Sequence, residues 1–468
     1  MDRACVTPRS GAVEHVESLH PDREAGPGPK LPAGGPGAGP RTRLGSLAAP
    51  LAFREFRLLF LGQAVSLVGS GAAPVALSFA LLQATGSVAV IGYALTAQIV
   101  PVLAFLLIGG VWADRLPRQR VMLCSDVVRF GVQAALGTLL VTGHLQLVTL
   151  LSLQAIKGIA EAFFTPASGG LVPLTVGSEH LQQANALRGI AQSAGSLGGP
   201  VLGGVLVATI GAGWALQVDG ATYLVSAFFL AAMHPAAQDC AQRAAGALRD
   251  LRDGWRAIRE RSWLSVVIVQ NMIFMTFAVA PTFVLGPLAA RAGFGGAEAW
   301  GLILGSMGVG ELLGGLGALT LRPSRALLSG CVLTPLYGLF LALLTTQTAL
   351  VGVCVAATGA GFAVAYFDAV WCTAMQGHVP DAVLSRVASF DAFGSLAGLP
   401  LGFMLAPFLS RLLGLDGALL VCAAMTAATA VFAAGAPSVR RLGGATTAGG
   451  GAVSCGHGHE VAAPSEPA

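Results

Sequence analysis

Twelve long apolar stretches occupy most of this sequence and restrict the folds open to it. A helix needs roughly 20 apolar residues to cross the hydrocarbon core of a bilayer. Lipid permits only helices or closed barrels, and the stretches lack the residue alternation of barrel strands. The sequence therefore predicts membrane-spanning helices at about 58–82, 88–112, 121–142, 146–174, 186–210, 214–233, 264–288, 299–320, 326–345, 348–373, 387–409 and 416–435.

Composition indicates a chain that is solvated largely by lipid. Charged residues make up 11% of the chain and hydrophobic residues 54%, whereas a soluble domain carries about a quarter charged residues. The net charge of +4 does not indicate a partner of nucleic-acid type. No pairing of a nucleophile with a base and no cluster of metal ligands argues for an enzyme, so we expect no catalytic residue, cofactor or metal.

The placement of arginine predicts the orientation of the helices. The segment GGVWADRLPRQR at 109–120 joins the second and third stretches, and it carries Asp114, Arg115, Arg118 and Arg120. Basic loops stay on the cytoplasmic side of a membrane. The other arginine-rich loops, among which we place Arg188 and Arg386, alternate with loops that are nearly free of arginine. We therefore expect both termini in the cytoplasm.

The two halves of the sequence resemble each other. In the fifth stretch GSLGG at 195–199 precedes Pro200 and Gly203, and in the eleventh GSLAG at 394–398 precedes Pro400. Repeated halves of this kind place a binding site at the midplane, between two bundles. We expect an all-α integral membrane protein with twelve transmembrane helices in two pseudo-symmetric six-helix bundles. The expected divisions are a disordered cytoplasmic tail at 1–52, an N-terminal bundle at 53–234, a linker with an amphipathic helix at 235–262, a C-terminal bundle at 263–436 and a second disordered tail at 437–468.

Several motifs resemble those of the major facilitator superfamily. The run GVWADRLPRQR, which begins at Gly110, is similar to the superfamily's loop motif between the second and third helices. A second motif, that of drug–proton antiporters, is matched by Gly195, Gly199, Pro200, Gly203 and Gly204. Smaller signatures point to the macrolide-efflux and enterobactin-exporter-like branch, namely FRLLFLGQ at 56–63, SDVVR at 125–129, KGIAEAFFTPA at 157–167, LQQANAL at 181–187 and RVASFD at 386–391.

The resemblance implies a conformational role for the arginine-rich loop. It places Asp114 near the start of the eleventh helix, where a carboxylate beside a helix N-terminus is stabilised. Asp114, Arg115, Arg118 and Arg120 would then form a conformational latch that closes the halves on the cytoplasmic side. The alternative is a loop that is simply anchored by basic residues.

Charged residues inside the spans are candidates for proton coupling because burying them is costly. The candidates are Glu161, Glu311, Asp368 and Lys157. The alternative is an acid that is satisfied by Lys157 or by the backbone. We expect Asp126, Arg129 and Asp219 to be structural.

Polar and aromatic residues within the spans are candidates for the lining of a substrate cavity. These residues are Gln63, Ser66, Gln154, Asn271, Met275, Tyr366 and Trp371. Packing in the core or against lipid is the alternative for each of them. Gln154 also stands where many proton-coupled relatives carry an arginine.

Taken together, these features predict a multi-pass exporter of the bacterial inner membrane. We expect a monomer that moves hydrophobic or amphiphilic small molecules, of the drug, macrolide or siderophore type, by proton antiport and alternating access. A lysolipid flippase of the same fold is one alternative. A nickel exporter is another, with Cys455, His457, His459 and Glu460 as metal ligands in the tail.

Overall fold

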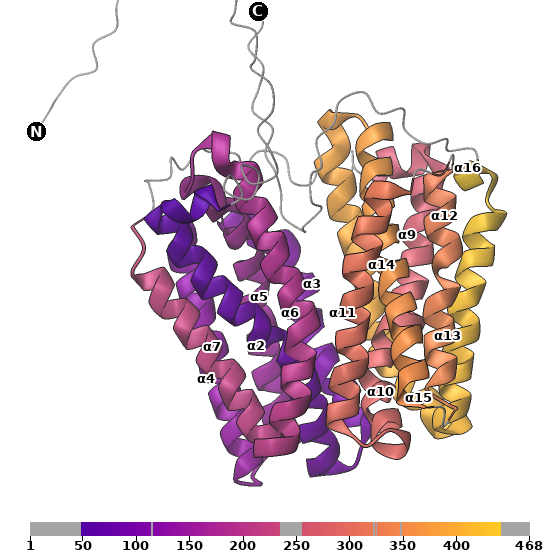
Figure 1. Ribbon diagram of the computed structural model, residues 1–468, viewed down its shortest axis with the longest axis horizontal. Coiled ribbons are helices and arrows are strands. Elements are labelled where there is room, and N and C mark those ends of the chain that lie inside the picture. The colour runs from indigo at the N-terminus through magenta and orange to yellow at the C-terminus, as the bar shows by residue number, and fades with distance from the viewer. Residues whose placement is uncertain are drawn as a thin grey trace, which may run out of the picture. The chain divides into compact units, whose positions relative to one another are not determined.

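The computed structural model describes residues 48–113, 116–234, 255–321, 323, 325–346 and 349–440. These residues belong to one compact unit, and they form helices and connecting loops with no strand among them (Figure 1). Both expected tails, most of the linker, Asp114 and Arg115 lie outside the described residues.

Six long helices make up the N-terminal half, preceded by the short η1 (Ala49–Ala52). Each of the six helices is continuous, and most of the loops between them are short. Their bounds are α2 Arg54–Thr85, α3 Val88–Ala113, α4 Arg118–Val141, α5 Leu147–Leu171, α6 Leu181–Ile210 and α7 Ala212–Ala231, with the short turns η2 (Val172–Leu174) and η3 (Ser178–His180) between α5 and α6.

The C-terminal half has more interruptions within its spans. The π-helical segment η4 (Met275–Val279) joins α9 to α10 within one continuous helical stretch, and Pro335 separates α12 from α13. The bounds are α9 Ser262–Phe274, α10 Ala280–Gly293, α11 Ala297–Thr320, α12 Ala326–Leu333, α13 Pro335–Leu343, α14 Leu350–His378, α15 Asp381–Gly435 and α16 Pro437–Arg440.

The helices account for all the predicted spans. Ten continuous segments of the described chain are long and apolar enough to cross a membrane. The segment that contains α15 holds two spans, because the backbone turns at Gly414 with a φ of 76°. The 20-residue helix α7 is not among the ten, since Gln217 and Asp219 lower its hydropathy. Counting the α15 segment twice and adding α7 gives twelve spans.

Two arginines correct the predicted helix boundaries. The fifth span begins at Leu181 and the eleventh at Asp381, several residues before the predicted starts. Arg188 and Arg386, which the sequence analysis placed in loops, therefore lie on helices. A long side chain allows this, because an arginine can keep its stem in an apolar surrounding while its charged end reaches a polar partner.

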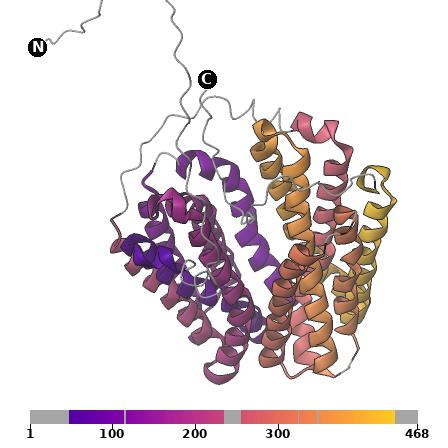
Figure 2. The ribbon, with the colours of Figure 1, turned by 45° about the horizontal axis from the view of Figure 1, so that its top comes forward.

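The same helix pairs pack in both halves. In the N-terminal half α2 packs against α6 and α3 against α5, and in the C-terminal half α15 packs against α9 and η4 and α11 against α14. Both ribbon views keep α2–α7 together as one group and α9–α16 as another (Figures 1 and 2). The two groups meet chiefly where α6 packs against α11 and α3 against α15.

Candidate functional site

The close packing of α6 against α11 joins the two halves through glycines. A Cβ on Gly204 would lie 3.2 Å from the Cα atoms of both Glu298 and Gly301. A Cβ on Gly308 would lie 2.7 Å from the Cα of Leu197. Real Cβ atoms need more room than this, so only glycine permits the two backbones to approach so closely.

A second contact of this kind joins α3 to α15. A Cβ on Gly92 would clash with the carbonyl oxygen of Phe403 and would lie 3.1 Å from Cγ of Pro407. Nearby, the hydroxyl of Ser78 on α2 donates to the carbonyl of Phe283 on α10 at 3.5 Å. We call these contacts, together with those of α6 and α11, the inter-half seam.

The inter-half seam lies toward one end of the helices. Gly92 is near the start of α3, Gly204 is near the end of α6 and Gly301 is near the start of α11. All three positions lie on the side away from the start of α2. The opposite end of the helices carries Arg118 and Arg120 at the start of α4.

The antiporter motif of α6 packs mainly within its own half. A Cβ on Gly199 would lie 2.6 Å from the Cα of Gly71, and Gly195 and Gly203 also face the backbone of α2. In the repeated half, a Cβ on Gly398 would lie 3.0 Å from Oγ1 of Thr276 in η4. The internal repeat thus gives equivalent close contacts in both halves, and Gly204 is the member of the motif that crosses to the other half.

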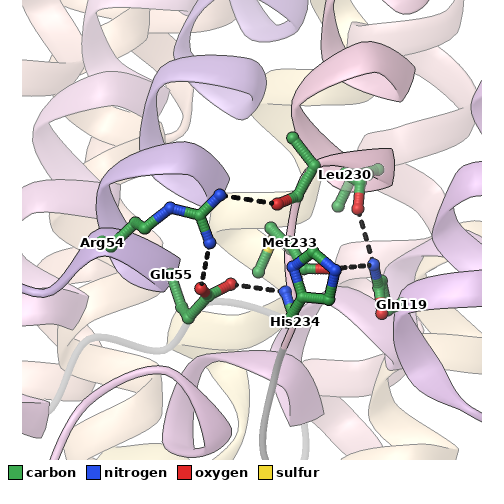
Figure 3. Close-up of polar contacts among 7 residues, drawn as sticks. Arg54, Glu55, Gln119, Leu230, Met233 and His234 are labelled. Carbon is green, nitrogen blue, oxygen red and sulfur yellow. Dashed lines mark hydrogen bonds and ion pairs between the residues drawn. The ribbon is translucent and has the colours of Figure 1, made fainter.

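The end of the helices that carries Arg118 is held together by side chains that bind backbone carbonyls. Arg118 donates to the carbonyl of Gly170 at the end of α5, whereas Arg120 is exposed. Gln119 donates to the carbonyls of Leu230 and Met233 at the end of α7, at 2.7 and 2.8 Å (Figure 3). These bonds satisfy acceptors that a helix C-terminus leaves free.

The start of α2 caps the same end of α7. Arg54 donates to the carbonyl of Ala232 at 3.2 Å, and it forms an ion pair with Glu55 at 2.8 Å. The carboxylate of Glu55 accepts the backbone N–H of His234 at 2.7 Å (Figure 3). Side-chain hydrogen bonds therefore join α2 and α4 to the end of α7, beside the candidate latch residues Arg118 and Arg120 at the start of α4.

The interior of the N-terminal half contains a charged cluster. Arg129 on α4 lies 3.7 Å from the carboxylate of Asp126. Its guanidinium also lies over the rings of Phe164 and Tyr223, at 4.2 and 5.5 Å. Asp126 is fully buried and Arg129 is 7% exposed. The ring faces compensate part of the cost of burying the cation.

The cluster extends to α5 and α7. Gln133 donates to Oδ2 of Asp219, and Lys157 and Arg129 both act electrostatically on Asp219. No hydrogen bond reaches Oδ1 of this carboxylate, and the residue is 1% exposed. We call Asp126, Arg129, Lys157, Glu161 and Asp219 the charged cluster.

Glu161 connects the charged cluster to α3. Its carboxylate accepts a hydrogen bond from Gln98 at 2.9 Å, and Gln98 in turn accepts one from Gln154 at 3.4 Å. The structure thus gives Glu161 an amide partner, and Lys157 interacts with Asp219. The candidate pair of Lys157 with Glu161 is not among the ion pairs of the described residues.

In the C-terminal half, helices α11 and α14 carry Glu311 and Asp368 and contain no lysine or arginine. Glu311 on α11 interacts with the hydroxyl of Ser196 on α6, across the boundary between the halves. Asp368 on α14 is exposed, and it lies within electrostatic range of Glu311 and Asp391. Asp391 on α15 accepts a hydrogen bond from the indole of Trp371 at 2.9 Å.

The candidate lining residues of the N-terminal half are buried, and the two glutamines among them have hydrogen-bond partners. Gln63 donates to Ser168 at 2.8 Å, and the same hydroxyl accepts a bond from Arg188 at 3.0 Å. Gln154 has no exposed surface, and Ser66 is 6% exposed.

The candidate lining residues of the C-terminal half fall into two groups. Tyr366 and Trp371 are buried in an aromatic core, where Tyr366 stacks on Phe362 and Trp371 on Phe367. Asn271 and Met275 are half-buried. Asn271 donates to Ser395 at 2.7 Å, and Met275 begins the π-helical segment η4.

Gln98 and Gln133 join these networks without having been named in the sequence analysis, and Arg188 and Asp391 join them although the sequence analysis assigned them no polar contact. An amide inside an apolar stretch was the available signal for the two glutamines, because a buried amide needs a partner. The tail residues Cys455, His457, His459 and Glu460 lie outside the described residues. Within the described part, no group of three or more potential ligands could hold a metal ion.

A sequence profile of the family described as transmembrane secretion effector matches residues 45–442, most of the chain. The chain belongs to this family of major facilitator transporters. It is therefore a membrane transporter rather than an enzyme.

Two curated relatives of this transporter are exporters by name. Macrolide efflux protein A of Streptococcus pyogenes is 24% identical over 383 residues, which cover 79% of this chain and 94% of the relative. Enterobactin exporter EntS of Citrobacter koseri is 28% identical over 374 residues, which cover 76% of this chain and 87% of the relative.

Solved structures show that this fold is the major facilitator fold. The nucleoside transporter NupG superposes with a TM-score of 0.68 at 12% identity, over 83% of this chain and 99% of NupG. The match to a bacterial homologue of the iron transporter ferroportin spans 81% of this chain and 98% of the homologue. Its inward-facing state gives a TM-score of 0.64 at 16% identity, and its outward-facing state gives 0.55 at 17%.

Proposed function

We propose that this transporter exports hydrophobic or amphiphilic small molecules in exchange for protons, by alternating access. We further propose that the conformation described here is the inward-facing one. In this proposal, the inter-half seam closes the outer side while the end that carries Arg118 is open to the cytoplasm.

The observation that carries the proposal is the position of the inter-half seam. Its contacts at Gly92, Gly204 and Gly301 lie toward one end of the bundle, away from the basic residues of the other end. Basic ends of membrane helices belong on the cytoplasmic side. The better superposition on the inward-facing state of the ferroportin homologue supports the same assignment.

Coupling to protons needs an acid that water reaches in one state and not in the other. Glu311 and Asp368 fit this requirement, because Asp368 is exposed and Glu311 contacts Ser196 of the opposite half. Movement of α11 against α6 would change the surroundings of Glu311 directly. Glu161 and Lys157 stay candidates, but their partners lie within their own half.

The relatives and the composition of the spans support the proposed substrate class. Macrolide efflux protein A and enterobactin exporter EntS are named for bulky molecules. An apolar cavity with a few polar groups suits such molecules, and Met275 offers an adaptable wall.

The test measures pH-driven efflux and counterflow in proteoliposomes loaded with a fluorescent amphiphilic dye. Glu311→Gln, Asp368→Asn, Glu161→Gln and Lys157→Met are the variants to compare. We expect at least one acid variant to lose most of its pH-driven efflux and to retain counterflow, because counterflow requires alternation but no net proton movement. Asp416, an exposed acid of the C-terminal half that lies outside the inter-half seam, provides the control Asp416→Asn.

Full pH-driven efflux in every acid variant would contradict proton coupling through these residues. Absence of dye flux in the unmodified protein, with transport of a lysolipid instead, would favour a flippase. These two results are distinguishable because the lysolipid is measured in the same vesicles.

A further inference from the structure

A groove between three helices of the N-terminal half combines an apolar rim with a carboxylate. It has a volume of about 430 Å³ and runs between α2, α6 and α7. Its rim includes Val65, Leu202 and Val218, which are 40, 39 and 38% exposed. Volumes above roughly 300 Å³ are typical of small-molecule sites.

One wall of the groove belongs to a helix that packs within the N-terminal half. Helix α7 packs against α4, α2 and α6, all within its own half. A neighbouring hollow of about 540 Å³ shares Val218 and continues along α7 to Trp214, which is 55% exposed. Tryptophan is enriched at the interface between lipid and water. An exposed apolar surface on a membrane-spanning helix faces lipid, so a ligand would reach this groove from the bilayer.

One carboxylate forms part of the otherwise apolar wall of the groove. Asp219 lines it together with Gly69 and Thr222. A Cβ on Gly69 would lie 2.9 Å from Oδ1 of Asp219, so this oxygen lies directly behind the glycine. Oδ1 is also the carboxylate oxygen that receives no hydrogen bond. A buried acceptor without a donor costs free energy, and a ligand that supplies the donor would recover it.

The charge of the surroundings selects the kind of donor. The charged cluster contains three carboxyl groups, on Asp126, Glu161 and Asp219, and two cations, on Arg129 and Lys157. An ammonium is a donor whose charge is opposite to that of a carboxylate, whereas an anion offers Oδ1 no donor and is repelled by it.

We propose that this groove binds amphiphiles that carry one protonated amine. The apolar part of the ligand lies along Val65, Leu202 and Val218, and its ammonium donates to Oδ1 of Asp219. Rotation of the half-buried Thr222 about χ1 opens the way, because its hydroxyl lies beside the position that a Cβ of Gly69 would occupy. The inference deepens the proposed function by naming a substrate class, and it rests on that function only in treating the ligand as a transported molecule.

Photolabelling of the full chain in lipid nanodiscs tests the groove without any transport step. The probes are a long-chain alkylamine and the alcohol of the same chain, each with the same photoactivatable group. Mass spectrometry then locates the labelled segments. We expect the amine to label residues 64–72 and 202–222 about tenfold more than the alcohol does, as a charge-assisted hydrogen bond predicts.

Three variants separate the contributions of the carboxylate and of the groove. Asp219→Asn should label equally with the two probes, because the charge is lost and the shape is kept. Val218→Phe should block both probes. Val225→Phe is the matched control, since Val225 is another valine of α7 at 39% exposure and does not line the groove.

Two results would overturn the proposal. One is equal labelling of this face by amine and alcohol in the unmodified protein, and the other is a block by Val225→Phe as strong as that by Val218→Phe. The valine pair keeps the test decisive if Asp219→Asn does not fold. Photolabelling of the groove does not depend on proton-driven export, and pH-driven efflux does not depend on the groove. A failure of one proposal would therefore be distinguishable from a failure of the other.

Discussion

The interiors of the two halves carry different charges although their helices pack in the same way. The N-terminal half buries carboxylates together with Arg129 and Lys157. In the C-terminal half, the helices that carry Glu311 and Asp368, α11 and α14, contain no lysine or arginine. The backbone architecture is thus repeated, whereas the electrostatic content is not.

The difference suggests a division of labour between the halves. A buried cluster of mixed sign is expensive to disturb, because removal of one partner leaves another charge without compensation. An acid such as Asp368, whose charged neighbours are themselves acids, can change its protonation without leaving a cation uncompensated. We interpret the N-terminal half as the more rigid partner and the C-terminal half as the one that titrates.

The largest effect should follow from breaking the charged cluster. Arg129→Met removes the cation that lies beside Asp126 and acts on Asp219. We expect about 3–5 kcal/mol of destabilisation, as for other buried pairs that lose one partner. Thermal unfolding in detergent, followed by size-exclusion chromatography, measures this. Asp368→Asn serves as the comparison in the other half, and an equal loss of stability there would remove the proposed division of labour.

A smaller effect should follow from crowding the inter-half seam. In Gly301→Ala the new Cβ would lie 2.5 Å from the carbonyl oxygen of Pro200. Overpacking typically costs about 1–3 kcal/mol, and here the cost falls on one conformation, so dye efflux should drop by roughly tenfold. Gly315→Ala, on the same helix with open space at its Cβ, should transport normally. Equal efflux from the two variants would show that the seam does not limit transport.

The smallest effect should follow from removing one hydrogen-bond donor from an acid in the C-terminal half. Trp371→Phe keeps the stacking on Phe367 and removes the indole donor to Asp391. The loss should be about 1 kcal/mol, the net value of one hydrogen bond, with a small change in the pH dependence of efflux. Circular dichroism melts and efflux measured at several pH values detect both changes. A loss as large as that of Arg129→Met would show that this half is equally rigid.

The sequence predicted the fold better than the site for physical reasons. Apolar stretches of spanning length and the repeated glycine motifs are local signals, so the twelve helices could be predicted to within a few residues at most ends. Helix α7 illustrates the limit, because the sequence shows that Asp219 lowers its hydropathy but does not show which helices this carboxylate contacts.

The contacts of the polar residues could not be predicted, because they join helices that are distant in the sequence. Nothing local to Gln98 indicates that it bonds Glu161, 63 positions away. Tyr366 and Trp371 look like candidates for a cavity, yet stacking buries them in the core. The periodicity of a helix that is apolar all round does not reveal which face points inward.

The most direct test of alternating access measures distances at both ends of the same molecule. Spin labels on unnatural amino acids at Arg120 and Gly377 report the basic end, and labels at Thr85 and Arg291 report the end with the seam. All four positions are exposed. Double electron–electron resonance in nanodiscs then follows both distances from neutral to acidic pH. The account predicts opposite changes, with one end closing as the other opens. Changes in the same sense at both ends, or a single fixed distance for each pair under all conditions, would contradict it.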